Sequence, residues 1–588
     1  MNKQLDTENV IWNLTDLYQG VNDPEIDQDL ASLAQEAGNI RSRYEGKIDN
    51  LDSGELYNLI SSLEKLSSGL TRISTFAFLN FSTQTGSPEA GACLQKIEEA
   101  ASRISTEIVF FKLEWNKLDQ DKADRFLKAE ELQHYRHYLE KLRAYAEHML
   151  TQAEETLLLE FAPVGTSSWT KLFEKIMGQI KFGEKGRSEE EVLADLHKAD
   201  RQVRKQAAAE MTEGLKSHLH ILTHIFNTIL AEKMISDRVR SYPSWISSMN
   251  IYNEVRESTV EALTSAVTDR YDIVQRYYLY KRELLGVSEL KDYDRYAPLP
   301  DLPEELISWP ECRDMVLTSF RRFSPKMAEI ASLFFDRNWI HAPVREGKRG
   351  GAFAHPAVPD VHPYVMVNYS GTLRDVSTVA HELGHGIHQY LAASQGHYNS
   401  RTPLVLAETA SVFAELIVFH DQLGRISDKE KNRAFTCQKL ESIFATVFRQ
   451  VSMNRFEDMM HRKRREAGEL SEEDLGQLWM DSQQEMFSDS LTLTRDYRVW
   501  WSYIPHFLHA PGYVYSYAFG ELLVLSLYRI YQQEGAPFID KYLHLLKQGG
   551  SRSPDELIAP FGIDLDEPSF WQGGLEVIDD LLKSVEEE

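Results

Sequence analysis

The chain has 588 residues, of which 42% are hydrophobic and 11% aromatic, an ordinary composition for a globular protein with a large core. Its 64 basic and 90 acidic residues give a net charge of −26, which argues against binding to nucleic acid or to an anionic membrane. Three widely spaced cysteines, Cys93, Cys312 and Cys437, predict no disulfide framework. With no signal-peptide pattern and no apolar run of about 20 residues, we expect a cytoplasmic protein.

Helical periodicity dominates the chain. Apolar residues spaced by three or four positions predict helices at 56–66, 92–113, 135–149, 258–285 and 440–453. A polar stretch at 183–192 predicts a surface linker, and the glycine- and proline-rich stretch 344–363 predicts a loop. The clearest strand pattern is YVMVNY at 364–369, rich in β-branched and aromatic residues.

The segment after this strand carries the motif with the most specific chemistry. Residues 379–391 read VAHELGHGIHQYL, and Thr372 with Asp375 has the spacing of a capping box, so the motif should lie on a helix. His381 and His385 are one helical turn apart, so their imidazoles can converge on one zinc ion. Glu382 projects to the side of this pair, where it can take a proton from the attacking water.

The third histidine of the motif, His388, is expected to have a different role. It lies seven positions after His381, roughly 10 Å further along a helix axis, too far to share the ion comfortably. The motif variant with a third histidine would need Gly at 388 and His at 391, whereas this chain has His388 and Leu391. We therefore expect His388 to be a polar residue or to orient a ligand.

A catalytic zinc site needs a third protein ligand and an open position. The apolar segment 403–419, PLVLAETASVFAELIVF, carries Glu408 and Glu415 seven positions apart, on one face of an expected helix. Because buried carboxylates are costly unless compensated, a metal or its histidines should lie nearby. Glu408, flanked by small residues, is the better ligand. Glu415 would orient a ligand histidine or form a structural salt bridge, and Asp375 would orient a ligand or only cap its helix.

Negative charge that develops on the attacked carbonyl oxygen needs preorganised hydrogen-bond donors. The aromatic segment 503–520, YIPHFLHAPGYVYSYAFG, offers five candidates: His506, His509, Tyr513, Tyr515 and Tyr517. A tyrosine stripe at helical spacing is also common in protein cores, so the residues alone leave both roles open.

These motifs together resemble the thimet oligopeptidase-like M3 metallopeptidases, and specifically their oligoendopeptidase F branch. The resemblance is carried by HELGH, by LAETAS at 406–411, and by IWNLTDLY at 11–18, YRHYLEKL at 135–142, RSYPSWISSMNIYNEV at 240–255 and GKRGGAF at 347–353. It implies a mainly α-helical, two-lobed, clam-like zincin fold with a small β-sheet beside the active-site helix and a deep central channel. We expect an N-terminal helical lobe at 1–200 and a catalytic region at 201–588.

The resemblance also implies roles for individual residues. It implies one zinc ion per chain, held by His381, His385 and Glu408, with Glu382 as general base and then proton donor. The oxyanion donors that it implies are His509, Tyr513 and Tyr517, with His506 and Tyr515 as alternatives. The strand at 364–369 resembles the edge strand on which such enzymes lay the substrate backbone. The substrate-binding residues expected from this are Tyr364, Asn368, Gly350 and Gly351, the glycines allowing close backbone approach.

We therefore predict a zinc-dependent oligoendopeptidase that hydrolyses internal bonds of short unfolded peptides in the cytoplasm, as a monomer or a dimer. One alternative is a zinc exopeptidase of the dipeptidyl carboxypeptidase kind, which a basic residue placed to bind the substrate C-terminus would favour. Another is a noncatalytic peptide-binding scaffold that holds zinc structurally. Glu382 argues against the scaffold, because a structural site has no use for a general base and usually has four protein ligands.

Overall fold

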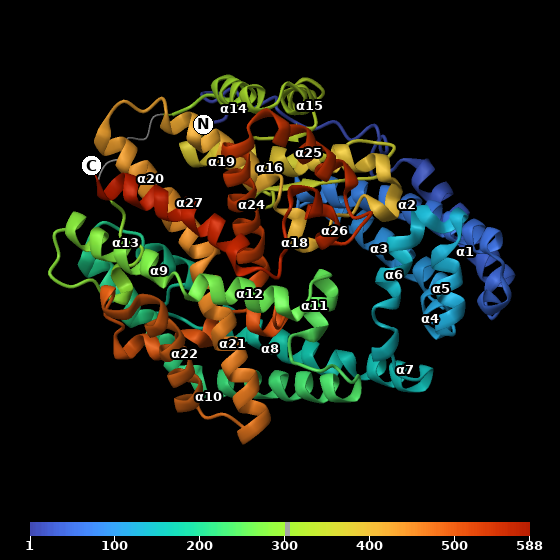
Figure 1. Cartoon of the computed structure of the whole chain (residues 1–588), viewed down its shortest axis with the longest axis horizontal. Helices are drawn as coiled ribbons and strands as arrows, with labels where there is room; N and C mark the ends of the chain where they lie inside the picture. The colour runs from blue at the N-terminus through green and yellow to red at the C-terminus, as the bar shows by residue number, and fades with distance from the viewer. Residues whose placement is uncertain (300–305, 588) are drawn as a thin grey trace. The chain divides into compact units, whose positions relative to one another are not determined.

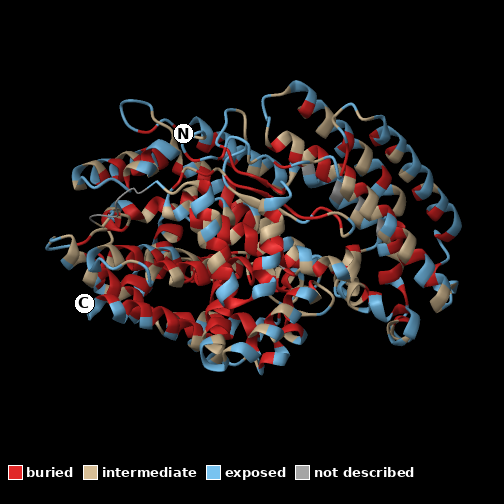
Figure 2. Ribbon diagram, turned by 90° about the horizontal axis from the view of Figure 1, so that it is seen from above, coloured by how far each residue is buried: buried red, intermediate tan, exposed pale blue. Residues whose placement is uncertain are grey.

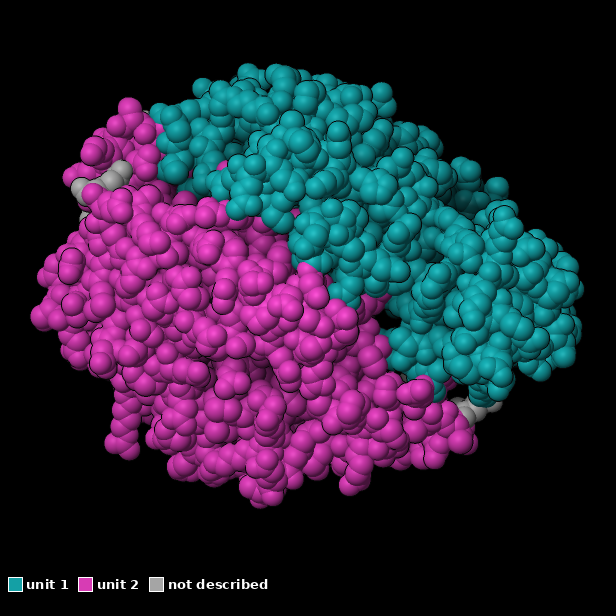
Figure 3. Space-filling view, in the orientation of Figure 1, with its two compact units in different colours: residues 1–146, 303–425, 530–563 teal, residues 147–302, 426–529, 564–588 magenta. Residues whose placement is uncertain are grey.

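The computed structural model describes residues 1–299 and 306–587, and Figure 1 shows the arrangement of their elements. The described chain is mostly helical and contains one three-stranded sheet, which confirms the mainly α prediction. It divides into two compact units, coloured separately in Figure 3. Unit 1 comprises residues 1–146, 303–425 and 530–563, and unit 2 comprises 147–302, 426–529 and 564–588. The predicted boundary at residue 200, between an N-terminal helical lobe and a catalytic region, stays a prediction.

Unit 1 contains the sheet. Most of the helices and strands of this unit lie in two long stretches of the chain. Its helices are α1 (Pro24–Tyr44), α2 (Ser53–Ser82), α3 (Pro88–Ile108), α4 (Phe110–Lys117), α5 (Gln120–Lys128), α6 (Arg136–Arg143), α14 (Trp309–Phe323), α15 (Pro325–Asp336), α16 (Leu373–Ala392), α17 (Gly396–Asn399), α18 (Leu404–Ala407), α19 (Ser411–Leu423), α25 (Ala536–Gln548) and α26 (Pro554–Ile558). Its strands are β1 (Ile340–His341), β2 (Phe353–His355) and β3 (Tyr364–Met366).

Unit 2 is built around one helix of 39 residues, α10 (Arg201–Val239). The other helices are α7 (Gln152–Phe161), α8 (Thr166–Gln179), α9 (Glu189–Asp195), α11 (Ser247–Asn253), α12 (Glu257–Thr268), α13 (Tyr271–Leu284), α20 (Lys429–Thr446), α21 (Phe448–Ala467), α22 (Glu472–Phe487), α23 (His506–His509), α24 (Tyr515–Glu534), most of which lies in this unit, and α27 (Pro568–Glu586).

Three predicted helices are interrupted in the structure, and a fourth ends early. The helix expected at 92–113 is broken at Val109, between α3 and α4, and the one expected at 135–149 is α6, which ends at Arg143. The helix expected at 258–285 is the pair α12 and α13, and the one expected at 440–453 spans the junction of α20 and α21 at Val447. A break of one or two residues barely shifts the apolar spacing, so periodicity alone does not detect it.

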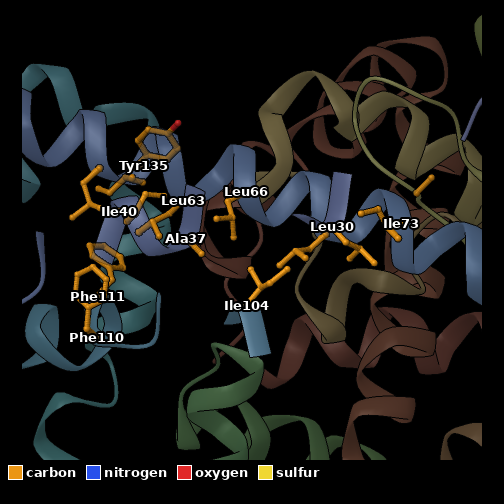
Figure 4. Close-up of a cluster of buried hydrophobic side chains, with 14 of the residues drawn as sticks. Leu30, Ala37, Ile40, Leu63, Leu66, Ile73, Ile104, Phe110, Phe111 and Tyr135 are labelled. Carbon is orange, nitrogen blue, oxygen red and sulfur yellow. The ribbon is translucent and has the colours of Figure 1, made fainter. Parts of the chain in front are cut away.

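Helix packing gives each unit its own core, visible as buried residues in Figure 2. In unit 1, α2 begins at a capping box in which Asp52 and Glu55 each bond the other's backbone, and its apolar side chains recur every three or four residues. Figure 4 shows Leu63 and Leu66 of this helix in the cluster with Leu30 of α1. Burial of each such leucine stabilises the fold by about 1.5–3 kcal/mol relative to exposure.

The sheet order corrects one prediction. The strands lie in the order β1–β3–β2, with β3 parallel to β1 and antiparallel to β2. The YVMVNY strand is therefore central, and the prediction that it is an edge strand is wrong. All three of its residues are buried, and both of its edges are paired. Strand order depends on pairing with segments distant in sequence, which one strand's own residues do not reveal.

Candidate active site

The helix that carries the motif, α16, begins where the sequence predicted. Thr372 Oγ1 accepts a hydrogen bond from the Asp375 backbone at 3.1 Å, and Asp375 Oδ2 accepts one from the Thr372 backbone at 3.0 Å. The same oxygen also accepts from the backbone and the hydroxyl of Ser370. Of the two roles considered for Asp375, the structure therefore supports the helix cap, which fixes the start of α16 at Leu373, eight residues before His381.

Three side chains of unit 1 meet in a geometry that suits a metal ion. Among the described residues, His381, His385 and Glu408 form the only group of three or more potential ligands whose donor atoms lie within 4.8 Å of one another. Glu408 Oε2 lies 3.3 Å from His381 Nε2 and 3.4 Å from His385 Nε2. Donors bound tetrahedrally at about 2.0–2.1 Å from one zinc ion stand about 3.3–3.4 Å apart, so this donor set fits the ion.

Glu408 reaches the histidines from a turn rather than from a helix. α18 ends at Ala407 and α19 begins at Ser411, so the prediction that Glu408 and Glu415 share one continuous helix is wrong. The turn is held by Ser411 Oγ, which donates to Glu408 Oε2 at 2.7 Å, and by Tyr542, whose hydroxyl donates to the Thr409 carbonyl at 2.9 Å. Burial opposes ionisation of Glu408, but hydrogen bonds from both histidines hold its pKa below the ordinary value.

Gly384 explains how the turn comes so close to α16. A Cβ atom at this position would lie 2.4 Å from the Ala410 carbonyl oxygen and 2.6 Å from Ser411 Cα. Both are backbone atoms, so only glycine allows this contact between the helix and the turn. The sequence did not single out Gly384, although its place between the two predicted histidine ligands was a usable signal.

Glu415 lies on the other side of the His381 ring. Its Oε2 is 3.4 Å from His381 Nδ1, so the carboxylate can accept the Nδ1 proton while Nε2 faces Glu408. Burial lowers the pKa of His381, but hydrogen bonds to Glu408 and Glu415 outweigh it and raise the pKa to about 10. The geometry fits the predicted orienting role.

Glu382 lies beside the donor set, and one of its two carboxylate oxygens has no described hydrogen-bond partner. The side chain is only 7% exposed, and its Oε2 has no hydrogen-bond partner among the residues that the structure describes. Burial raises the pKa of this carboxyl group, partly offset by the two histidines and by a hydrogen bond from the Ala354 backbone. A buried carboxyl of raised pKa beside a metal site is a typical arrangement for a general base.

Ala354 shows that the open edge of β2 faces α16. Its antiparallel partner Val365 donates its N–H to the carbonyl of Trp339, the residue before β1, so the backbone groups of Val365 face β1. Ala354 must then turn its own N–H and C=O to the outer edge. There Glu382 meets the N–H, and Gln389 Nε2 lies 3.5 Å from the carbonyl oxygen. Sequence analysis missed Ala354 and Gln389, because their roles depend on the sheet order.

His388 lies outside the donor set, as expected. It is buried, and its Nε2 lies 3.3 Å from Thr402 Oγ1. Burial lowers the pKa of His388 to about 3, so the ring is neutral at physiological pH.

The predicted substrate-binding residues of unit 1 differ in how accessible they are to a substrate. Asn368 Nδ2 donates to the Gly351 carbonyl at 2.8 Å and to the Arg349 carbonyl at 3.0 Å, so it braces the glycine loop. Gly351 has φ +77°, a conformation that favours glycine, and Gly350 beside it is exposed. Tyr364, in contrast, is fully buried in the central strand, and its side chain is closed off from any substrate.

The predicted oxyanion donors all lie in unit 2, where the structure groups only some of them. Tyr517 OH lies 3.4 Å from His506 Nε2, and the Tyr513 and Tyr517 rings meet edge to face at 5.1 Å. Tyr515 is buried and bonds Asn250 and Asn253, so it belongs to the core. His509 Nε2 instead lies 3.6 Å from a carboxylate oxygen of Glu174. Among the candidates, the group His506, Tyr513 and Tyr517 is therefore the compact one.

A mainly helical chain that presents two histidines and a glutamate from one helical turn, with a second glutamate from a later turn, defines a metallopeptidase. Comparison with known proteins gives the same class. The sequence matches Peptidase family M3 over residues 321–577 and Oligopeptidase F over residues 114–182.

Relatives match almost the entire chain. Oligopeptidase PepF of Bacillus subtilis is 25% identical over 587 residues, 98% of this chain and 87% of that protein. An oligoendopeptidase F homolog of Lactococcus lactis is 25% identical and matches 99% of this chain and 97% of its own length. A crystal structure from Chlamydophila abortus superimposes with a TM-score of 0.88 at 26% identity, covering 98% of both chains. Oligoendopeptidase-F from Enterococcus faecium shares the fold, with a TM-score of 0.72 at 22% identity and coverage of 96% and 98%.

The chain belongs to peptidase family M3, in its oligoendopeptidase F branch, as the motifs predicted. It is a metalloendopeptidase, and its family implies a metal ion and peptide substrates. Within residues 1–299 and 306–587, no helix combines the length and apolar character needed to span a bilayer.

Proposed function

We propose that this protein is a zinc-dependent oligoendopeptidase of short unfolded peptides, with one zinc ion held by His381, His385 and Glu408. The observation that carries the proposal is the approach of Glu408 Oε2 to both histidine Nε2 atoms, at 3.3 and 3.4 Å. Two neutral imidazoles and one carboxylate are a typical catalytic zinc ligand set, which leaves one position for water or substrate. When bound, zinc would polarise the scissile carbonyl and make the attacking water more acidic.

The chain's own residues would move the proton. Glu382 is the proposed base: its Oε2, without a partner among the described residues, accepts the proton of the attacking water and later gives it to the leaving amine. Because burial raises the pKa of this carboxyl group, its neutral form is less costly than that of an exposed glutamate. Glu415 would keep the His381 ring in the orientation that presents Nε2 to the metal.

The open edge of β2 is the proposed resting place of the substrate backbone. Ala354 turns its N–H and C=O to that edge, and an extended peptide that adds there as a further strand would replace Glu382 and Gln389 as their partners. Gly350 and Gly351 precede this strand and would let the peptide approach closely. Donors from the segment 503–520 for the developing oxyanion stay a prediction, with His506, Tyr513 and Tyr517 as the compact group. The cytoplasm is the proposed location, on the basis of the three free cysteines.

A series of fluorogenic peptides of increasing length, blocked at both ends, tests the proposal. We expect cleavage at internal bonds, a fall in rate beyond a limiting length, loss of activity with a chelator and recovery when zinc is added back. An exopeptidase would need a free end and would leave the blocked series intact. Cleavage that resists the chelator, with no zinc found in the purified protein, would reject the proposal.

A further inference from the structure

A cavity of about 680 Å³ lies in unit 1 and is lined by residues of α2, α3, the loop after β2 and the second half of α16. His385, a proposed zinc ligand, is part of its wall, so the cavity adjoins the site where a peptide would be cleaved. Its walls are mostly apolar, with Leu70, Phe78 and Ile97 among them. A volume of this size accommodates a substrate residue together with part of its neighbour.

Polar groups without protein partners face this apolar cavity. His355, the last residue of β2, accepts a hydrogen bond at Nδ1 from the Ala357 backbone at 3.1 Å. In the neutral ring the proton is therefore on Nε2, and no described residue accepts it. Burial and the charge of Arg401 lower the pKa of His355 to about 4, so this N–H donor is neutral at pH 7. Thr75 Oγ1 is buried in the same wall without a described partner.

Arg401 supplies a positive charge to the same cavity. It lies between α17 and α18 and forms no ion pair with any residue in the described part of the chain. Burial lowers the pKa of two histidines of the wall, His355 and His397, and the charge of Arg401 lowers both further. Arg401 is itself exposed to solvent, so a ligand that enters the cavity can reach its guanidinium.

The acidic groups around this cavity do not neutralise Arg401. Glu64 accepts hydrogen bonds from Tyr135 OH at 2.6 Å and from the Tyr398 backbone at 3.0 Å. Asp360 pairs with Arg72 at 3.4 Å. Glu98, on the α3 wall, is exposed to solvent. The cavity therefore combines a free cation and a neutral N–H donor, both of which suit an anionic ligand group.

We propose that this cavity is a substrate subsite that selects a carboxylate, bound by the Arg401 guanidinium and by His355 Nε2–H. The inference rests on the proposed peptidase function and adds a preference for one kind of peptide. The carboxylate can come from an Asp or Glu side chain or from the free C-terminus of the peptide. Both present the same planar, two-oxygen group, which the guanidinium can bind through two parallel hydrogen bonds.

Three sets of peptides separate these two sources. The first is neutral, with glutamine at the variable positions and an amidated C-terminus. The second replaces one glutamine at a time by glutamate, and the third keeps the glutamines but frees the C-terminus. For each set, kcat/KM is measured with the parent protein and with Arg401→Gln and Arg401→Lys. A matched control is Arg103→Gln, which removes the same charge from an exposed position on α3.

We expect the parent protein to prefer carboxylate peptides from one set, which identifies the source. Arg401→Gln should reduce the ratio of kcat/KM between carboxylate and neutral peptides about tenfold, the typical effect of losing a charge-assisted hydrogen bond. Arg401→Lys should keep part of the preference, and Arg103→Gln should keep all of it. Calorimetry with the Glu382→Gln variant gives the same comparison as dissociation constants, without turnover.

The two proposals fail in different ways. If the parent protein cleaves none of the three sets, the peptidase proposal fails first. If it cleaves all three sets and the ratio is the same with Arg401→Gln as with the parent, the subsite proposal is wrong while the peptidase proposal stands. An equal fall of the ratio in Arg103→Gln would assign the preference to net charge and would also overturn the subsite.

Discussion

Replacement of Gly384 by alanine tests whether the contact between α16 and the Glu408 turn determines the metal site. The added Cβ would lie 2.4 Å from the Ala410 carbonyl oxygen and 2.6 Å from Ser411 Cα. Carbon and oxygen atoms in contact normally stand near 3.4 Å, so the helix and the turn must separate by about 1 Å. Neither neighbour can yield by a side-chain rotation, because both atoms belong to the backbone.

A separation of this size has two measurable consequences. Overpacking of this kind costs about 1–3 kcal/mol of unfolding free energy. A shift of about 1 Å also far exceeds the roughly 0.2 Å tolerance of metal–ligand distances, so Glu408 would leave its position against the two histidines. We therefore expect Gly384→Ala to lose most of its metal and at least about 100-fold in kcat/KM.

Two other glycines provide graded controls in the same unit. A Cβ at Gly386 would meet the ring of Phe334 at 2.7 Å, a side chain that can tilt, so Gly386→Ala should cost less and keep its metal. Gly38 on α1 has no neighbour within 4 Å, so Gly38→Ala should stabilise the fold by about 0.5–1 kcal/mol. The assays are chemical denaturation, metal content by mass spectrometry and peptide cleavage. Full metal content and parent activity in Gly384→Ala would refute the reasoning.

Substitutions at four further positions have defined outcomes. Glu382→Gln should keep the metal and lose most turnover, and equal turnover with full metal content would remove Glu382 from the mechanism. Glu415→Ala should weaken metal affinity about 10- to 100-fold, measured by competition with a chelator, whereas Glu415→Gln keeps an acceptor oxygen and should lose less. Tyr364→Phe removes a buried hydroxyl without a described partner, so denaturation should show unchanged or higher stability, and KM should not move. Burial raises the pKa of Glu457 from 4.5 to about 8, so its protonated form contributes stability that is fully present below about pH 4.5 and is lost as pH rises to about 8. In Glu457→Gln, the denaturation midpoint should therefore fall less between pH 5 and 9 than in the parent protein.

The motif helix and its metal donors were predictable because the features that identify them lie close together in the sequence. The capping box between Thr372 and Asp375 fixes the start of α16, and a spacing of four puts His381 and His385 on one face whatever the rest of the fold does. Glu408 was identified from the cost of a carboxylate in an apolar segment, which holds in any fold. These inferences used neither sheet order nor helix packing.

The wrong prediction about the strand and the undecided one about the oxyanion donors both concern relations that only tertiary structure sets. The strand at 364–369 has a typical strand composition, but its place between β1 and β2 follows from pairing with two other segments, 340–341 and 353–355. The choice between His506 and His509 depends on the path of the loop that contains Gly512, whose φ is +82°. That glycine donates its N–H to the buried Glu457 at 3.0 Å, a residue 55 positions earlier in the chain. Spacing within the segment 503–520 contains no information about that contact.

The turn between α18 and α19 brings together site residues that sequence analysis considered one by one. Thr409, Ala410 and Ser411 are fully buried, and they are small enough to lie under α16 at the place where Gly384 has no side chain. Glu408 precedes them and reaches Nε2 of His381, while Glu415, one helical segment later, reaches Nδ1 of the same ring. Larger residues in the turn, or a side chain at 384, would push both carboxylates away from that ring. The glycine, the three small residues and the two glutamates therefore act as one structural unit that orients a single imidazole from both sides.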